Sequence, residues 1–99
     1  MSEEPAQLVQ IERIIAKIEA EGDIPSGRPW ILTSDVEQLA HLYAQRQEQV
    51  HQLALLRSAG ALPYAIRHSE QQIVMLDKAI RQVEEQAVMH ARKAAGRPD

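Results

Sequence analysis

The most regular hydrophobic spacing in the chain runs from residue 63 to residue 95. Residues recur there with the seven-residue period of a coiled-coil seam, which predicts one helix on the order of 48 Å long at about 1.5 Å per residue. One seam position is occupied by Ile66, Ile73, Ile80, Ala87 and Ala94, and the other by Ser69, Leu76, Val83 and His90. Because such a seam needs a second helix against it, this segment predicts a helical partner.

A second helix is predicted over residues 35–57. Ser34 and Glu37 have the spacing of a capping box, in which each side chain bonds the exposed backbone N–H of the other residue. The residues expected to share one apolar face are Val36, Leu39, Tyr43, Val50 and Leu53.

The connection between these two helices is short and contains Gly60 and Pro63. Short connections join antiparallel neighbours, so we expect a helical hairpin with Leu53 opposite Arg67.

An additional N-terminal amphipathic helix is predicted over residues 3–21, with Gly22 as its left-handed cap. Its apolar stripe is expected to contain Leu8, Ile11, Ile14, Ile15 and Ile18. Residues 23–33 include two prolines and a glycine and form a predicted connector, and residues 96–99 form a frayed tail. The prediction is an all-α fold with coiled-coil-like packing and a single helical domain over residues 1–99.

Composition narrows the function classes. The 99 residues carry a net charge of −3, with 11 basic and 14 acidic residues, so they lack a polybasic nucleic-acid or membrane footprint. The absence of cysteine excludes disulfides and thiolate sites. Because the N-terminus is acidic and no apolar run is long enough to span a bilayer, we expect a soluble cytoplasmic protein without membrane association.

Four apolar residues of the long helix fall outside its seam: Val74, Met75, Val88 and Met89. At 100° per residue they lie about 100° or more from the middle of the seam. A short first helix cannot cover all of them, and we expect the end near Met89 to extend beyond the second helix as well. We therefore predict that this off-seam surface binds a second copy or another protein, although single exposed apolar residues are also common.

Trp30 and Arg28 are a secondary candidate anchor for a partner, since Trp and Arg are enriched at interface hot spots. The alternative is that the connector folds back and lays Trp30 over the helices. Polar residues also interrupt the apolar stripes at Arg46, Arg57, Ser69 and His90. Such residues can fix register or partner choice, whereas long Arg side chains can extend past the apolar layer into water.

Two weaker patterns carry possible chemistry. Glu48 and His51 have the Glu-x-x-His spacing of di-iron helical bundles, but both lie far from the centre of their helix's apolar face and are expected to face water. Arg92, Lys93 and Arg97 make the end of the last helix mildly basic, which is a weak nucleic-acid pattern without interleaved aromatic residues.

The sequence therefore favours a small helical protein-interaction module, an adaptor, inhibitor or regulatory subunit, rather than an enzyme. It predicts binding of another protein through helical surfaces and self-association as a homodimer, with no cofactor. The alternatives are a nucleic-acid-binding regulator and a di-iron-type metalloprotein using Glu48 and His51.

Overall fold

The computed structural model describes residues 6–24 and 30–96, and side chains from residue 10 onward. These residues form three α-helices: α1 (Ala6–Gly22), α2 (Thr33–Ser58) and α3 (Pro63–Ala94). The predicted all-α class is confirmed, and α3 begins at the predicted residue. The predicted start of the first helix at residue 3 and most of the proline-containing connector lie outside the described residues. Within the described part, no helix is long and apolar enough to cross a membrane.

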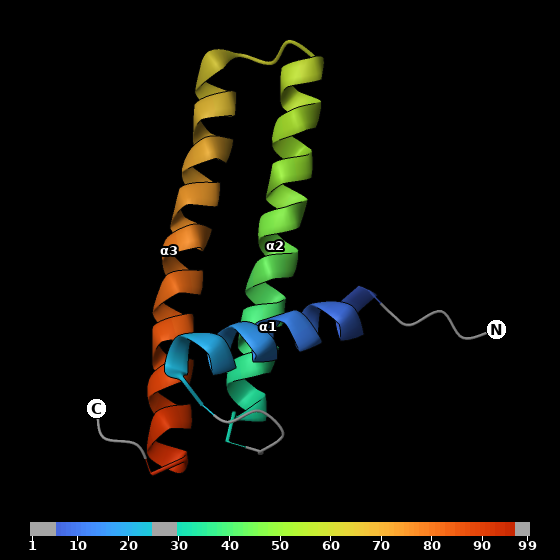
Figure 1. Cartoon of the computed structure of the whole chain (residues 1–99). Helices are drawn as coiled ribbons and strands as arrows, with labels where there is room; N and C mark the ends of the chain where they lie inside the picture. The colour runs from blue at the N-terminus through green and yellow to red at the C-terminus, as the bar shows by residue number, and fades with distance from the viewer. Residues whose placement is uncertain (1–5, 25–29, 97–99) are drawn as a thin grey trace, which may run out of the picture.

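α2 and α3 form the predicted antiparallel hairpin, and α1 crosses it near the end opposite the α2–α3 connection (Figure 1). Side-chain pairs between α2 and α3 show the register. Arg57 pairs with Glu70 near the connection, and Asp35 pairs with His90 at the other end. The register is shifted by about one helical turn from the expected one, which placed Leu53 opposite Arg67. α2 therefore reaches the end of α3, and the expectation that the segment near Met89 extends beyond it is wrong.

The core lies where all three helices meet. Ile14 and Ile18 from the predicted stripe of α1 are buried, while Ile11 and Ile15 are half-buried. Their buried neighbours on the hairpin are Val36, Leu39, Ile80, Val83, Ala87 and Ala91. Ala87 and Ala91 are almost fully buried, and their small side chains let neighbouring elements approach α3 closely. The core therefore occupies one end of the hairpin rather than its whole length.

The ends of α1 and α2 are closed by the same backbone arrangement. At the end of α1, the N–H of Ile24 bonds the carbonyl of Glu19, and Asp23 has the left-handed φ of 50°. Gly22 is therefore not the left-handed residue that we expected. An added Cβ at Gly22 would lie 2.6 Å from Cδ1 of Ile24, so this glycine provides space. At the end of α2, the left-handed residue is Gly60, with a φ of 68°.

The predicted capping box at Ser34 and Glu37 does not form. The N-cap of α2 is Leu32, no side chain bonds the exposed backbone N–H groups there, and Ser34 lies inside the helix. Asp35 in the first turn is buried and instead accepts a 2.9 Å hydrogen bond from Nδ1 of His90. The first turn of α2 is therefore held by a tertiary contact with α3 and not by a side-chain cap.

Replacing Gly60 with alanine should lower the free energy of unfolding by about 1 kcal/mol, because a Cβ is strained at positive φ. No atom lies within 4 Å of the added Cβ, so the loss would be conformational and not steric. Urea denaturation measures it. Gly60→Asn is the control, since asparagine tolerates this conformation and should cost less. Equal losses for both variants would contradict the explanation.

Asp35→Ala should cost about 1–3 kcal/mol of unfolding free energy, because it removes the acceptor for His90 and a favourable charge in the first turn of α2. Ser34→Ala should change stability by less than about 0.5 kcal/mol, since no capping bond is lost. Denaturation of the two variants side by side tests the assignment. A larger loss for Ser34→Ala would restore the capping-box interpretation.

Candidate interaction surface

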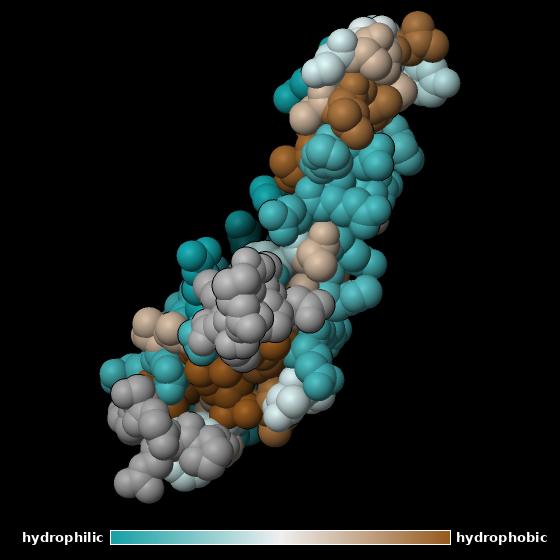
Figure 2. All heavy atoms as spheres, turned by 90° about the vertical axis from the view of Figure 1, so that its right-hand side faces the viewer, coloured by the Kyte–Doolittle hydropathy of each residue, from teal (hydrophilic) through white to brown (hydrophobic). Residues whose placement is uncertain are grey.

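The hairpin beyond α1, formed by residues 46–77, is here called the stalk. Eight large hydrophobic residues are exposed in the described part of the chain, and six of them lie on the stalk. We call these six the stalk surface: Val50, Leu55, Leu62, Tyr64, Val74 and Met75. Figure 2 shows hydrophobic side chains at the end of the molecule that carries the α2–α3 connection, separated by a hydrophilic band from those near α1. The stalk surface is therefore distinct from the core.

The four off-seam residues predicted as a contact surface have different environments. Val74 and Met75 are 52% and 63% exposed, and Met89 is 47% exposed near the other end of α3. Val88 is half-buried and packs against the core, and its Cγ1 would lie 3.4 Å from a Cβ added at Gly22. The end of α1 therefore covers Val88, which is a correction to its predicted place on an open surface.

Trp30 is half-buried and packs against the core, as in the alternative that laid it over the helices. Its indole N–H is buried without a hydrogen-bond partner among the described residues. Arg28, the other half of the predicted anchor, lies outside the described residues. We therefore leave Trp30 outside the proposed surface.

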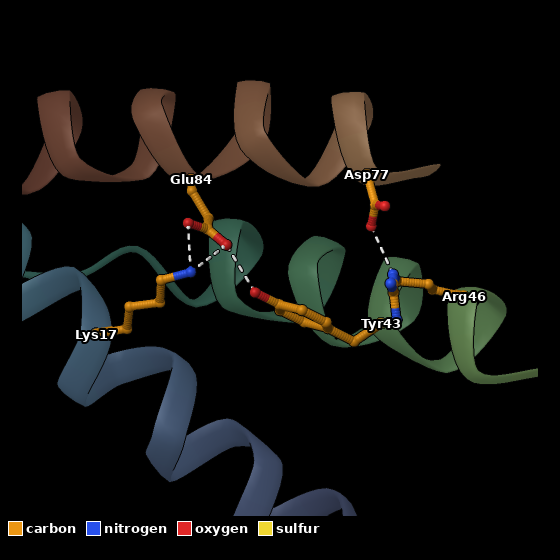
Figure 3. A network of polar contacts seen from close by, with 5 residues as sticks. All are labelled: Lys17, Tyr43, Arg46, Asp77 and Glu84. Atoms are coloured by element: carbon orange, nitrogen blue, oxygen red, sulfur yellow. Dashed lines mark hydrogen bonds and ion pairs between the residues drawn. The ribbon is translucent and has the colours of Figure 1, made fainter. Parts of the chain in front are cut away.

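The face of the hairpin that carries α1 is held by a polar network (Figure 3). The carboxylate of Glu84 on α3 accepts a 2.6 Å hydrogen bond from the hydroxyl of Tyr43 on α2 and is 3.0 Å from Nζ of Lys17 on α1. The Glu84 side chain is only 12% exposed, so this carboxylate joins all three helices at a largely enclosed point. Arg46 pairs with Asp77 further along the same face.

These contacts raise the pKa values of two groups. The pKa of Tyr43 lies above its usual 10.0, because burial disfavours the phenolate and because the hydroxyl donates to Glu84. The pKa of Lys17 lies above 10.5, chiefly because its ammonium group bonds Glu84. Both groups hold their protons, and through Glu84 they connect α1 to both helices of the hairpin. The network is structural in its geometry.

The described residues of the two weaker patterns lie on different helices, α2 and α3. Glu48 and His51 are both exposed, and no group of three or more His, Asp or Glu side chains in the described residues could hold a metal ion. At the end of α3, Lys93 is exposed and Arg92 is half-buried, whereas Arg97 lies outside the described residues.

Four members of the stalk surface were missed by sequence reasoning: Val50, Leu55, Leu62 and Tyr64. Val50 was expected on the apolar face of its helix but is 41% exposed. Leu55 falls on the outer side of α2, roughly 160° from Leu53 at 100° per residue. Counting the angle of every apolar residue of this helix, as for the long helix, would have found it. Leu62 and Tyr64 flank the turn, where periodicity gives no direction.

Comparisons with known proteins give no relative for this chain. No family model matches it, and no curated protein or solved structure is significantly similar.

Titration of the Tyr64→Phe variant, in which Tyr43 is the single tyrosine, should show phenolate forming above pH 10.0. Absorbance in the near ultraviolet measures this directly. Because the Tyr43 and Lys17 pKa values are raised on folding, their stabilisation is complete below about pH 10 and is lost as the pH rises through the folded values. The urea concentration at the midpoint of unfolding should therefore decrease as the pH rises above about 10.

Adding Glu84→Gln should lower the Tyr43 pKa without returning it fully to 10.0, since burial remains after the acceptor charge is lost. A Tyr43 pKa at or below 10.0 in the Tyr64→Phe protein would contradict the assigned contact.

Proposed function

We propose that this protein is a small interaction module that binds another protein through the stalk surface. The observation that carries the proposal is the unequal use of the hairpin. One end packs against α1 and contains the core, while the other projects as two helices with large apolar side chains in water. Large exposed apolar side chains concentrated on one part of a protein are typical of protein-binding sites.

The partner proposed for the stalk is an apolar helical segment laid along it. Helical recognition of this kind places a few large side chains in contact with the apolar face of a helix. Tyr64 and Met75 are suited to this role, since they are 71% and 63% exposed and aromatic residues and Met are enriched at interfaces. An adaptor, inhibitor or regulatory subunit would act by this binding and without catalysis.

The geometry of the hairpin supports a stable presentation of this surface. The three-helix junction at Glu84 anchors α1, and the Arg46–Asp77 and Arg57–Glu70 pairs connect the two helices of the stalk. Because α2 and α3 run side by side, an incoming segment meets a surface that is already formed. Less ordering is then required on binding, which favours affinity.

The test uses two double variants. The stalk variant carries both Tyr64→Ser and Met75→Ser, and the matched control carries Gln71→Ser and Gln82→Ser, which change exposed polar residues of the same helix. Proteins that bind the wild-type chain are recovered from the source cells by affinity capture. The strongest one is then purified and titrated against each variant by calorimetry.

The stalk variant should weaken binding about tenfold or more, since each truncated hot-spot residue costs more than about 1 kcal/mol. The control should bind as the wild type does. Thermal unfolding of all three proteins should agree closely, because the changed side chains are exposed. A partner that binds the stalk variant with unchanged affinity, or the absence of any saturable partner, would contradict the proposal.

A further inference from the structure

The flank of the hairpin that faces away from the ion pairs has an unusual composition. Two sets of positions, spaced alternately by four and three residues, contain only Gln, Leu, Ala, Ser, Val or His. One set runs along α2 from residue 38 to 56, and the other runs along α3 from residue 65 to 90. This is heptad spacing, so each set forms one stripe along its helix. Val83 and His90, at the far end of the α3 stripe, are occupied by the core and by Asp35. We therefore call the remaining part of the two stripes, residues 45–56 and 65–79, the uncharged face.

The two stripes meet in a groove. Gln49 and Gln52 on α2 line it together with Ser69 and Gln72 on α3, and a second hollow continues from Gln49 and Gln72 towards Gln45 and Leu76. The first hollow has a volume of about 810 Å³. Glu48 lines the second hollow and His68 the first, and the other residues that line the two hollows are uncharged.

The opposite flank, which carries α1, is strongly charged. The hollow there is lined by Lys17, Arg46, Asp77, Arg81 and Glu84 together with Tyr43 and Ile80. The ion pairs of Lys17, Arg46 and Arg57 connect to Glu84, Asp77 and Glu70, all on this side of α3. Thus the charges of the hairpin are not spread evenly around it.

Ser69 supplies a second and independent observation. Its side chain is 6% exposed, and its hydroxyl is buried without a hydrogen-bond partner. An unsatisfied buried hydroxyl costs about 1–3 kcal/mol, so a structure rarely retains one without a reason. Ser69 lines the groove, so a small rotation of its side chain would bring the hydroxyl within reach of a group on an incoming helix.

We propose that the uncharged face binds the same face of a second copy of this chain, making a four-helix bundle from two hairpins. In a symmetric dimer, one patch meets itself, and charged residues near the axis oppose their own copies. A face without charge avoids this repulsion. Glutamine is also self-complementary, since its amide both donates and accepts hydrogen bonds, as the Ser69 hydroxyl does.

The size of the face agrees with such a dimer. Beyond the core, the stripe on α3 is about 21 Å long and that on α2 about 17 Å, and two adjacent helices are roughly 20 Å wide. The face therefore offers on the order of 400 Å² per copy, about half of what a standard interface buries on each partner, which is in the range of weak and reversible association. Val74 lies on the other flank, whereas Tyr64 lines the first hollow and is shared with the stalk surface. The dimer is therefore tested at Gln49 and Gln72, which are not part of the stalk surface.

The decisive experiment places charge on the face. Sedimentation equilibrium of wild type over about a hundredfold range of concentration should show a reversible dimer. A double variant with Gln49→Glu and Gln72→Glu should raise the dimer dissociation constant about tenfold or more, because like charges then meet across the symmetry axis of the dimer. The matched control is Gln47→Glu with Gln71→Glu, which adds the same charge at exposed neighbouring positions and should leave the dimer intact.

A charge-reversal arm identifies which surfaces meet. Gln49→Lys with Gln72→Lys should also be monomeric alone, and mixing it with the Glu variant should restore the dimer as a heterodimer. A monomeric wild type, a dimer insensitive to charge at Gln49 and Gln72, equal weakening by the control, or failure of the mixture to associate would each overturn the proposal. Circular dichroism of every variant confirms that the helices are retained.

Discussion

The fold depends on the burial of α1 against one end of the α2–α3 hairpin. Ile18 and Leu39 are fully enclosed there, and Ala91 on α3 is equally inaccessible. A helix of 17 residues is only about 26 Å long, so crossing the hairpin covers a fraction of α3, which has 32 residues. The same contact that creates the core therefore also creates the uncovered stalk.

Polar contacts give this apolar junction its geometry. Burying the Glu84 carboxylate is unfavourable unless it is paired, and Tyr43 and Lys17 both bond it from different helices. Asp35 and His90 act similarly at the end of the hairpin, where they bring the start of α2 beside the end of α3. Each pair constrains one helix relative to another, whereas the hydrophobic contacts alone are less directional.

The hairpin presents two chemically different surfaces to solution. The stalk surface consists of large apolar side chains, and the uncharged face consists chiefly of Gln and small residues in heptad spacing. A single chain of this size has little core to spare, and association through either surface would add buried area. Tyr64 lies at the boundary of the two surfaces, so self-association and partner binding would compete there.

Hydrophobic periodicity was sufficient to predict the number of helices, their class and the antiparallel hairpin. The repeat from Ile66 to Ala87 is local information, and it determines one helix face whatever the chain packs against. Tertiary structure decided the remainder. Ser34 has the sequence of a cap but lies inside α2, because Asp35 is drawn into a contact with His90, a residue 55 positions away. Val88 is covered and Val74 is not, because the crossing point of α1 is set by side-chain packing between distant segments, which periodicity along one helix does not contain.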